Sequence, residues 1–243
     1  MTKSLISEEV TSVCFSSKGE AIAGTFAGLL KSYNRSDILT NSVKTSGAIW
    51  SVCENGGKVY AQCSDRTVEV YSLDLKVQLK RWTTQFQAGK IAVVNGEVYV
   101  SNPKKKSVVT FDGDGNEVGK ITHPSFEVPI HIKPYGKDGL VVSDTEAECV
   151  FMFRNGHCKW QIGHANCTGI SVDRNNEQIW VKRLNKKTLT VLSPEGEKLG
   201  YTEVHSLTSD IKHDMAVDGK RLYLASNNGL STSREGSSVC VIS

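Results

Sequence analysis

The pattern of apolar and other residues along the chain repeats six times as a short β-type strand. The six strands are Ala21-Ile-Ala-Gly, Lys58-Val-Tyr-Ala, Glu97-Val-Tyr-Val, Gly139-Leu-Val-Val, Gln178-Ile-Trp-Val and Arg221-Leu-Tyr-Leu. Equivalent apolar positions, from Ile22 to Leu222, are 37, 39, 42, 39 and 43 residues apart. A period close to this is typical of the four-stranded blades of a propeller. We therefore predict an all-β fold, a six-bladed β-propeller.

The fifth repeat shows how one blade is built. It contains four alternating segments, 168–173, 178–183, 189–192 and 197–202, with turn residues Asn175-Asn176 and Pro194-Glu195-Gly196 between them. This alternation predicts four antiparallel strands, which we call A to D from the central channel outward. A single domain over 1–243 is expected, with blades at about 10–45, 46–84, 86–123, 127–165, 166–207 and 209–243, the last completed by 2–9.

The sixth repeat lacks an outer strand. Its strand C is predicted at Ser238-Val-Cys-Val-Ile, which ends the sequence, and the stretch 227–238 before it is predicted to be a loop. The residues before the first blade, 2–9, have no blade of their own. We expect this N-terminal segment to pair beside the C-terminal strand and close the ring.

Composition narrows the class of protein. The 243 residues are 39% hydrophobic, enough for a large core, and no apolar run approaches the ~18 residues of a membrane span or forms a secretory signal. The seven cysteines include no C-x-x-C pair, which argues against a zinc site and a disulfide framework. Reduced thiols indicate a cytosolic or nuclear compartment, of which we predict the cytoplasm, and the propeller is expected to be monomeric without a membrane partner.

Two repeats carry a family resemblance. Gly169-Ile-Ser-Val-Asp, Ile179-Trp-Val and Val191-Leu-Ser-Pro-Glu-Gly in the fifth repeat, and Val98-Tyr-Val and Thr110-Phe-Asp-Gly-Asp-Gly in the third, are similar to the NHL repeat. The family implies a recognition module like the C-terminal propeller of TRIM (tripartite motif) ubiquitin ligases, some of which bind RNA and others proteins. The chain departs from the naming motif, because Lys186 and Lys187 follow Asn185. It has no RING or B-box cysteine–histidine pattern, so ligase activity would belong to a region outside this chain.

The loops sort by charge. The B–C and D–A loops share one face, where bases outnumber acids, whereas the A–B and C–D loops on the opposite face are net acidic. Two phenylalanines accompany the bases, a pairing that stacks unpaired nucleotides. The predicted RNA- or partner-binding residues are Arg66, Lys104, Lys105, Lys106, Lys182, Arg183, Lys186, Lys187, Phe86 and Phe126.

The ligand of this basic face has two candidates. We expect a non-enzymatic recognition module that binds single-stranded or hairpin RNA, or alternatively an acidic protein surface that would be a substrate or partner. Asp144, Glu146 and Glu148 in blade four interrupt the basic arc and disfavour a continuous path for phosphates.

An enzyme of the calcium-dependent lactonase or lyase type is a third hypothesis. Asn102, Asp144 and Asn227 follow strand B, but no inner-strand Glu is found to complete a cation site with them. His131 on strand A has no identifiable carboxylate partner or nucleophile and is interpreted as a packed or water-bonded histidine. No catalytic residue, metal or cofactor is therefore predicted.

Overall fold

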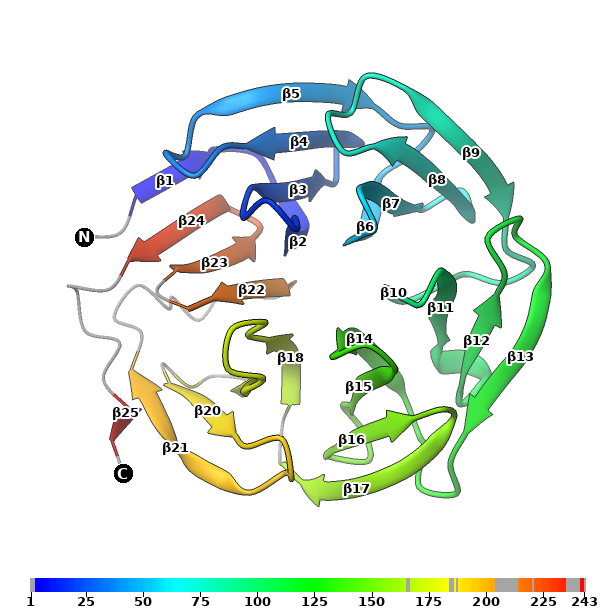
Figure 1. Cartoon of the computed structure of the whole chain (residues 1–243), viewed down its shortest axis with the longest axis vertical. Helices are drawn as coiled ribbons and strands as arrows, with labels where there is room; N and C mark the ends of the chain where they lie inside the picture. Colours follow the sequence, from blue (N-terminus) through cyan, green and yellow to red (C-terminus); the bar gives the residue numbers. More distant parts are fainter. Residues whose placement is uncertain are drawn as a thin grey trace.

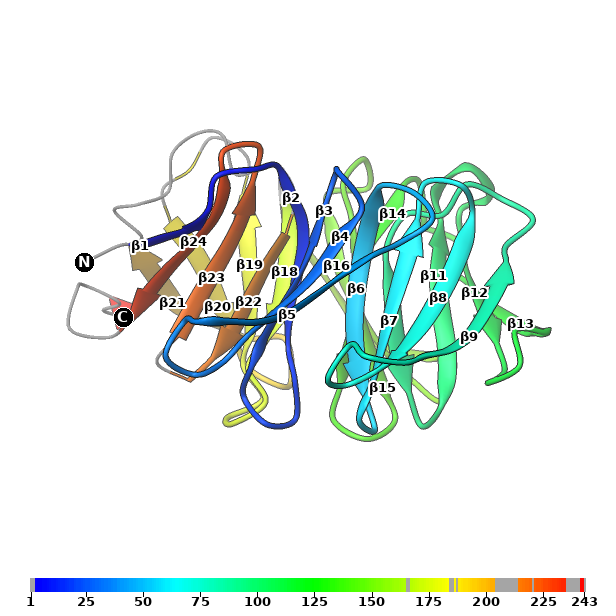
Figure 2. The ribbon, with the colours of Figure 1, turned by 90° about the horizontal axis from the view of Figure 1, so that it is seen from above.

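The computed structural model describes residues 3–164, 167–183, 186, 188–203, 214–219, 221–234 and 241–242. Six antiparallel sheets surround a central axis, with the first strand of each sheet innermost (Figure 1). Seen from the side, the sheets form a disc whose loops gather on two opposite faces (Figure 2). The predicted six-bladed β-propeller is confirmed. No helix in the described parts of the chain is long and apolar enough to span a membrane.

Blades one to three follow the predicted order from inner to outer strand. Blade one holds β2 (Val10–Phe15), β3 (Ala21–Thr25), β4 (Leu29–Tyr33) and β5 (Leu39–Lys44). Blade two holds β6 (Ile49–Asn55), β7 (Lys58–Cys63), β8 (Thr67–Ser72) and β9 (Gln78–Thr83). Blade three holds β10 (Ile91–Val94), β11 (Glu97–Asn102), β12 (Ser107–Phe111) and β13 (Glu117–Thr122), with a 3-10 turn, η1 (Pro103–Lys105), between β11 and β12.

Blades four to six complete the ring. Blade four holds β14 (Pro129–Tyr135), β15 (Gly139–Asp144), β16 (Cys149–Arg154) and β17 (His157–Gly163). Blade five holds β18 (Cys167–Val172), β19 (Ile179–Arg183), β20 (Thr188–Leu192) and β21 (Lys198–Glu203). Blade six holds β22 (Asp214–Asp218), β23 (Arg221–Ser226), β24 (Gly229–Arg234) and β1 (Lys3–Ile6).

The core lies between adjacent blades. Val108 of blade three, for example, packs in one cluster with Leu140 and Phe151 of blade four, all at most 3% exposed. Strand β7, next to the inner strand of blade two, is buried on both faces from Val59 to Cys63, whereas the outer strand β9 is mostly exposed. Alternating β-branched and aromatic residues thus fold into strands because each blade covers its neighbour's apolar face.

Tryptophans on two outer strands contact glycines in the next blade. Trp82 lies against Gly115 and Trp160 against Gly196, so close that a Cβ added to either glycine would be under 3.0 Å from the indole ring. Both glycines have positive φ, 88° and 87°. Trp160 Nε1 also donates to the carbonyl oxygen of Pro194 at 2.9 Å. These contacts hold blade two to blade three and blade four to blade five.

The N-terminal strand closes the ring, as predicted, but its partner differs. Strand β1 pairs antiparallel with β24, with Lys3 opposite Thr232, so β24 is strand C of blade six (Figure 1). The prediction that 227–238 is a loop and that strand C lies at 238–242 was wrong. Strand β25 (Val241–Ile242) instead pairs with β21 as a fifth strand of blade five. Strand β24 escaped detection because Leu230 is its only large apolar residue.

Candidate interaction surface and central channel

A pocket of about 530 Å³ lies where the loops of blades two and three meet on the predicted basic face. It gathers four of the predicted binding residues in one place: Arg66, Phe86, Lys104 and Lys105. The rest of its lining comes from the β9–β10 loop and strands β11 to β13, namely Gln85, Gln87, Asn102, Ser107, Val109, Glu117, Lys120 and Thr122. Four cationic side chains therefore face this pocket with one carboxylate, that of Glu117.

The 3-10 turn η1 presents the lysines. Pro103 occupies its first turn, where a missing N–H costs no hydrogen bond, and Lys106 ends it in the left-handed conformation at φ 49°. Lys104 and Lys105 are exposed and line the pocket. Lys106 is exposed too, but its ammonium forms an ion pair with Glu127. The turn therefore directs two of the three predicted lysines to the pocket.

Phe86 supplies the apolar part of the pocket. Its ring is half-buried and stacks on Phe111 with centroids 6.4 Å apart. The Thr84 hydroxyl donates to the carbonyl oxygen of Phe86 at 2.8 Å, and the Thr84 backbone N–H donates to that of Arg66 at 2.8 Å. Because one threonine ties both segments together, the aromatic ring and the Arg66 loop are held in a fixed relation.

Two predicted binding residues are not on the surface. Phe126 is 1% exposed because its ring packs against Phe151 and Phe153, with centroids 5.0 and 5.7 Å away. Lys182 is 5% exposed, and burial lowers the pKa of its ammonium. The structure contradicts their placement on an exposed binding face. Phe126 fills the core between blades three and four and cannot stack a base.

Two further predicted residues, Arg183 and Lys186, lie apart from the pocket. Arg183 is half-buried at the end of β19 and Lys186 is exposed just beyond it, both in blade five. Blade five lies across the ring from blades two and three (Figure 1). Lys187 lies outside the described residues. Arg183 and Lys186 thus form no common site with the pocket.

Asp144 is structural. Its carboxylate is fully buried and accepts hydrogen bonds from the backbone N–H groups of Glu127 at 2.8 Å, Val128 at 2.9 and 3.0 Å, and Ala147 at 2.9 Å. It therefore organises the loops that flank it and contributes no exposed charge. The acidic break predicted in blade four is carried by Glu146 and Glu148, which are exposed.

The central channel contains a polar network that the sequence analysis missed. Lys133 Nζ lies 2.9 Å from Asp214 Oδ1, and the Ser12 hydroxyl donates to Asp214 Oδ2 at 2.6 Å. Lys90 Nζ donates to the carbonyl oxygens of Thr11 at 2.9 Å and Trp50 at 2.8 Å, which links three blades. Burial lowers the pKa of Lys90 to about 8. The sequence signal for this network was a charged residue within an otherwise apolar strand A, as at Lys133 in β14 and Asp214 in β22.

His131 lies in the same channel. It is 6% exposed, and burial, reinforced by the charge of Lys90, lowers its pKa to about 3. The imidazole is therefore neutral at pH 7. Its Nδ1 has no hydrogen-bond partner within the described residues. No inner-strand glutamate was predicted for a cation site. Glu54 does lie on inner strand β6. Its carboxylate, however, accepts hydrogen bonds from the backbone N–H groups of Ser17 and Gly57.

Over the described residues, no group of three or more His, Cys, Asp or Glu side chains is arranged to hold a metal ion.

Comparisons with known proteins support the fold. No protein-family model matches the chain, and no curated protein matches it in sequence. Among solved structures, a streptogramin B lyase is similar over 96% of both chains, with a TM-score of 0.72 and 9% identity. The WD40 propeller domain of Doa1 is similar over 94% of this chain and 80% of its own, with a TM-score of 0.69 and 13% identity. At such low identity these similarities show the propeller fold alone.

Proposed function

We propose that the protein is a non-enzymatic recognition propeller that binds an acidic protein segment in the pocket between blades two and three. The observation that carries this proposal is the convergence of Arg66, Lys104 and Lys105 on the half-buried Phe86. Interfaces commonly combine a fixed aromatic anchor with arginine, and positive potential steers an acidic ligand toward them.

The pocket favours a protein segment over RNA. Single-stranded RNA is held by several aromatic side chains that stack successive bases. Phe126 is buried, and Phe86 already stacks on Phe111. Glu127 neutralises the charge of Lys106, which lies next to the pocket, so the positive charge does not continue beyond the pocket along this turn. Pocket amides from Gln85, Gln87 and Asn102 also suit the backbone of an extended peptide.

The resemblance to NHL repeats supplies the wider role of this proposal. A TRIM-type ligase presents such a propeller to its substrate, and the acidic segment would then belong to a protein destined for ubiquitination. The six cysteines within the described residues are all free, which supports work in the reducing cytoplasm.

The test compares two probes on the full chain. A fluorescein-labelled peptide of alternating glutamate and leucine and a single-stranded RNA of equal charge are titrated at fixed salt, with fluorescence polarisation as the readout. The Lys104→Glu/Lys105→Glu variant should weaken peptide binding more than tenfold, since two attractive charges become repulsive. Lys58→Glu/Lys76→Glu, which alters two exposed lysines on the opposite face, is the matched control.

The outcomes separate the hypotheses. If the two double variants bind the peptide with the same affinity, or if the wild type does not bind the peptide at all, the pocket is rejected as the acidic-segment site. RNA binding that exceeds peptide binding, falls steeply with salt and disappears in the Lys104/Lys105 variant would assign the pocket to RNA instead.

A further inference from the structure

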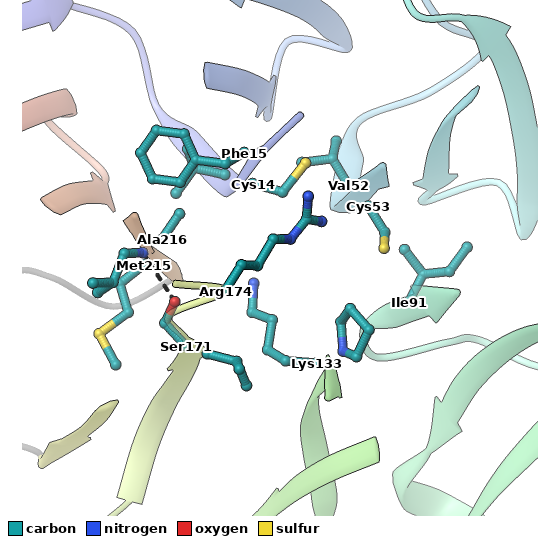
Figure 3. Close-up of a pocket in the computed structure, with 14 residues that line it drawn as sticks. Cys14, Phe15, Val52, Cys53, Ile91, Lys133, Ser171, Arg174, Met215 and Ala216 are labelled. Carbon is teal, nitrogen blue, oxygen red and sulfur yellow. Dashed lines mark hydrogen bonds between the residues drawn. The ribbon is translucent and has the colours of Figure 1, made fainter. Parts of the chain in front are cut away.

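The central channel contains a cavity that opens toward the acidic face, away from the proposed interaction pocket. The cavity has a volume of about 50 Å³ and is lined by the inner strands of all six blades (Figure 3). It adjoins a wider vestibule of about 500 Å³ formed by the A–B turns, and Pro134, Val172 and Arg174 line both spaces. A small molecule can therefore reach the cavity from this face.

Two cations point into the cavity. Figure 3 shows the side chains of Lys133 and Arg174 directed toward its centre. Burial raises the pKa of the Cys14 thiol, and the nearby charges of Lys133 and Arg174 lower it by a smaller amount. Both cations therefore lie close to this thiol. Burial raises the pKa of Cys53 as well. Both thiols are therefore neutral at pH 7 and do not offset the positive charge.

The carboxylates next to these cations already accept other hydrogen bonds. Asp214 accepts from Ser12 and from the Val13 N–H in addition to Lys133. Glu54 accepts from the N–H and hydroxyl of Ser17 and from the Gly57 N–H.

Arg174 is held loosely by comparison. Its Nη1 is 3.5 Å from Glu54 Oε2 and its Nη2 donates to the Glu54 carbonyl oxygen at 3.4 Å. Both contacts are longer than an ordinary charged hydrogen bond, and 46% of the side chain is exposed. Among the described residues, the charged side chains that line the cavity are those of Lys133 and Arg174, and no carboxylate lines it. The guanidinium therefore keeps donors for a ligand, and the local charge favours an anion.

The remaining wall limits the kind of anion. Ser171 accepts from the Val217 N–H at 3.0 Å, so its hydroxyl proton is the one further donor that it can offer. The other walls include the apolar side chains of Val13, Val52 and Ile91. One ammonium, one planar guanidinium and one hydroxyl match the two oxygens of a carboxylate. A phosphate would place additional oxygens against apolar walls, at a desolvation cost.

We propose that Lys133 and Arg174 bind the carboxylate of a small polar organic acid whose body lies in the vestibule. The vestibule is lined by Asn55, Asn95 and Lys137, and also by Glu54 and Glu177, whose carboxylates can accept hydrogen bonds from the hydroxyl groups of such a molecule. This ligand site is independent of the acidic-segment pocket, which lies on the other face.

The experiment uses the full chain with lactate as probe and lactamide as its uncharged counterpart, at constant ionic strength and pH 7. Ligand-observed NMR gives the affinity and thermal denaturation reports stabilisation. Lactate should bind and lactamide should not. Arg174→Gln should weaken lactate binding by about tenfold to a hundredfold, the loss expected for one hydrogen bond between charged groups. Arg154→Gln is the matched control, because Arg154 is also half-exposed and lies 3.4 Å from an aspartate, Asp138, outside the cavity.

A second variant, Lys133→Met, should abolish lactate binding. It also removes the ion pair that Lys133 forms with the buried Asp214 carboxylate, so it can destabilise the fold. Arg174→Gln therefore decides. Equal binding of lactate and lactamide, unchanged lactate affinity in Arg174→Gln, tighter binding of inorganic phosphate, or no lactate binding up to about 50 mM would each overturn the proposal.

Discussion

Replacing Asp144 by alanine should destabilise the propeller strongly. The change removes the acceptor for the N–H groups of Glu127, Val128 and Ala147. A hydrogen bond to a charged group contributes about 1.5–3 kcal/mol to stability. Because these loops are partly exposed and water can replace part of the loss, we expect the free energy of unfolding to fall by about 3–5 kcal/mol. For a chain of this size that corresponds to a drop in Tm of about 6–20 °C.

Thermal denaturation followed by tryptophan fluorescence measures this drop, and two further variants with smaller expected losses serve as comparisons. Asp144→Asn keeps one acceptor oxygen and should lose about half as much stability. Glu146→Ala alters an exposed carboxylate on the same loop and should change the free energy of unfolding by less than about 0.5 kcal/mol. The reasoning fails if Asp144→Ala melts within a degree or two of the wild type, or if Glu146→Ala is equally damaging.

Three further predictions concern stability. Removing residues 1–9 should lower Tm severely, since it leaves β24 without its outer neighbour; an unchanged Tm would contradict the ring closure. Gly196→Ala should cost about 1–3 kcal/mol more than Gly156→Ala in urea denaturation, because both glycines have positive φ but only Gly196 meets a tryptophan ring; equal costs would remove the packing role of Trp160. His131 has a folded pKa of about 3, below its unfolded value, so its neutral form contributes stability that is present above about pH 6.5 and is lost as pH falls toward 3. In His131→Gln, the urea midpoint should therefore fall less between pH 6.5 and 4 than it does in the wild type. An identical fall in both proteins would show that His131 does not cause the pH dependence.

Hydrophobic periodicity was sufficient to predict the blades, because each strand of the regular repeats buries alternating apolar residues against a neighbour. It failed at β24, whose residues Gly-Leu-Ser-Thr-Ser-Arg are held by pairing with β23 and β1. The apolar Val241–Ile242 looked more like strand C, yet pairs with β21. Pairing between distant segments outweighed local pattern here.

Side-chain burial at the loops was the part that sequence could not supply. Lys104 and Lys105 are exposed, because the turn that starts at Pro103 projects from the sheet. Phe126 looked the same as Phe86 in sequence, but the next blade covers it with Phe151. Lys133 and Arg174 are far apart in sequence, and the packing of blade four against blade five brings them to one cavity.

The pairing of β1 with β24 also orders the folding of the chain. Strand β1 is synthesised before every other strand of the ring, whereas its partner comes from the sixth blade. Contacts between such distant segments carry a large entropic cost and form slowly. The first strand must therefore wait without its native neighbour while five blades assemble, and its short length and its lysine and serine content limit mispairing during that time. Ring closure therefore requires β24 of blade six, and a chain in which β1 and β24 have not paired would expose an open sheet edge there.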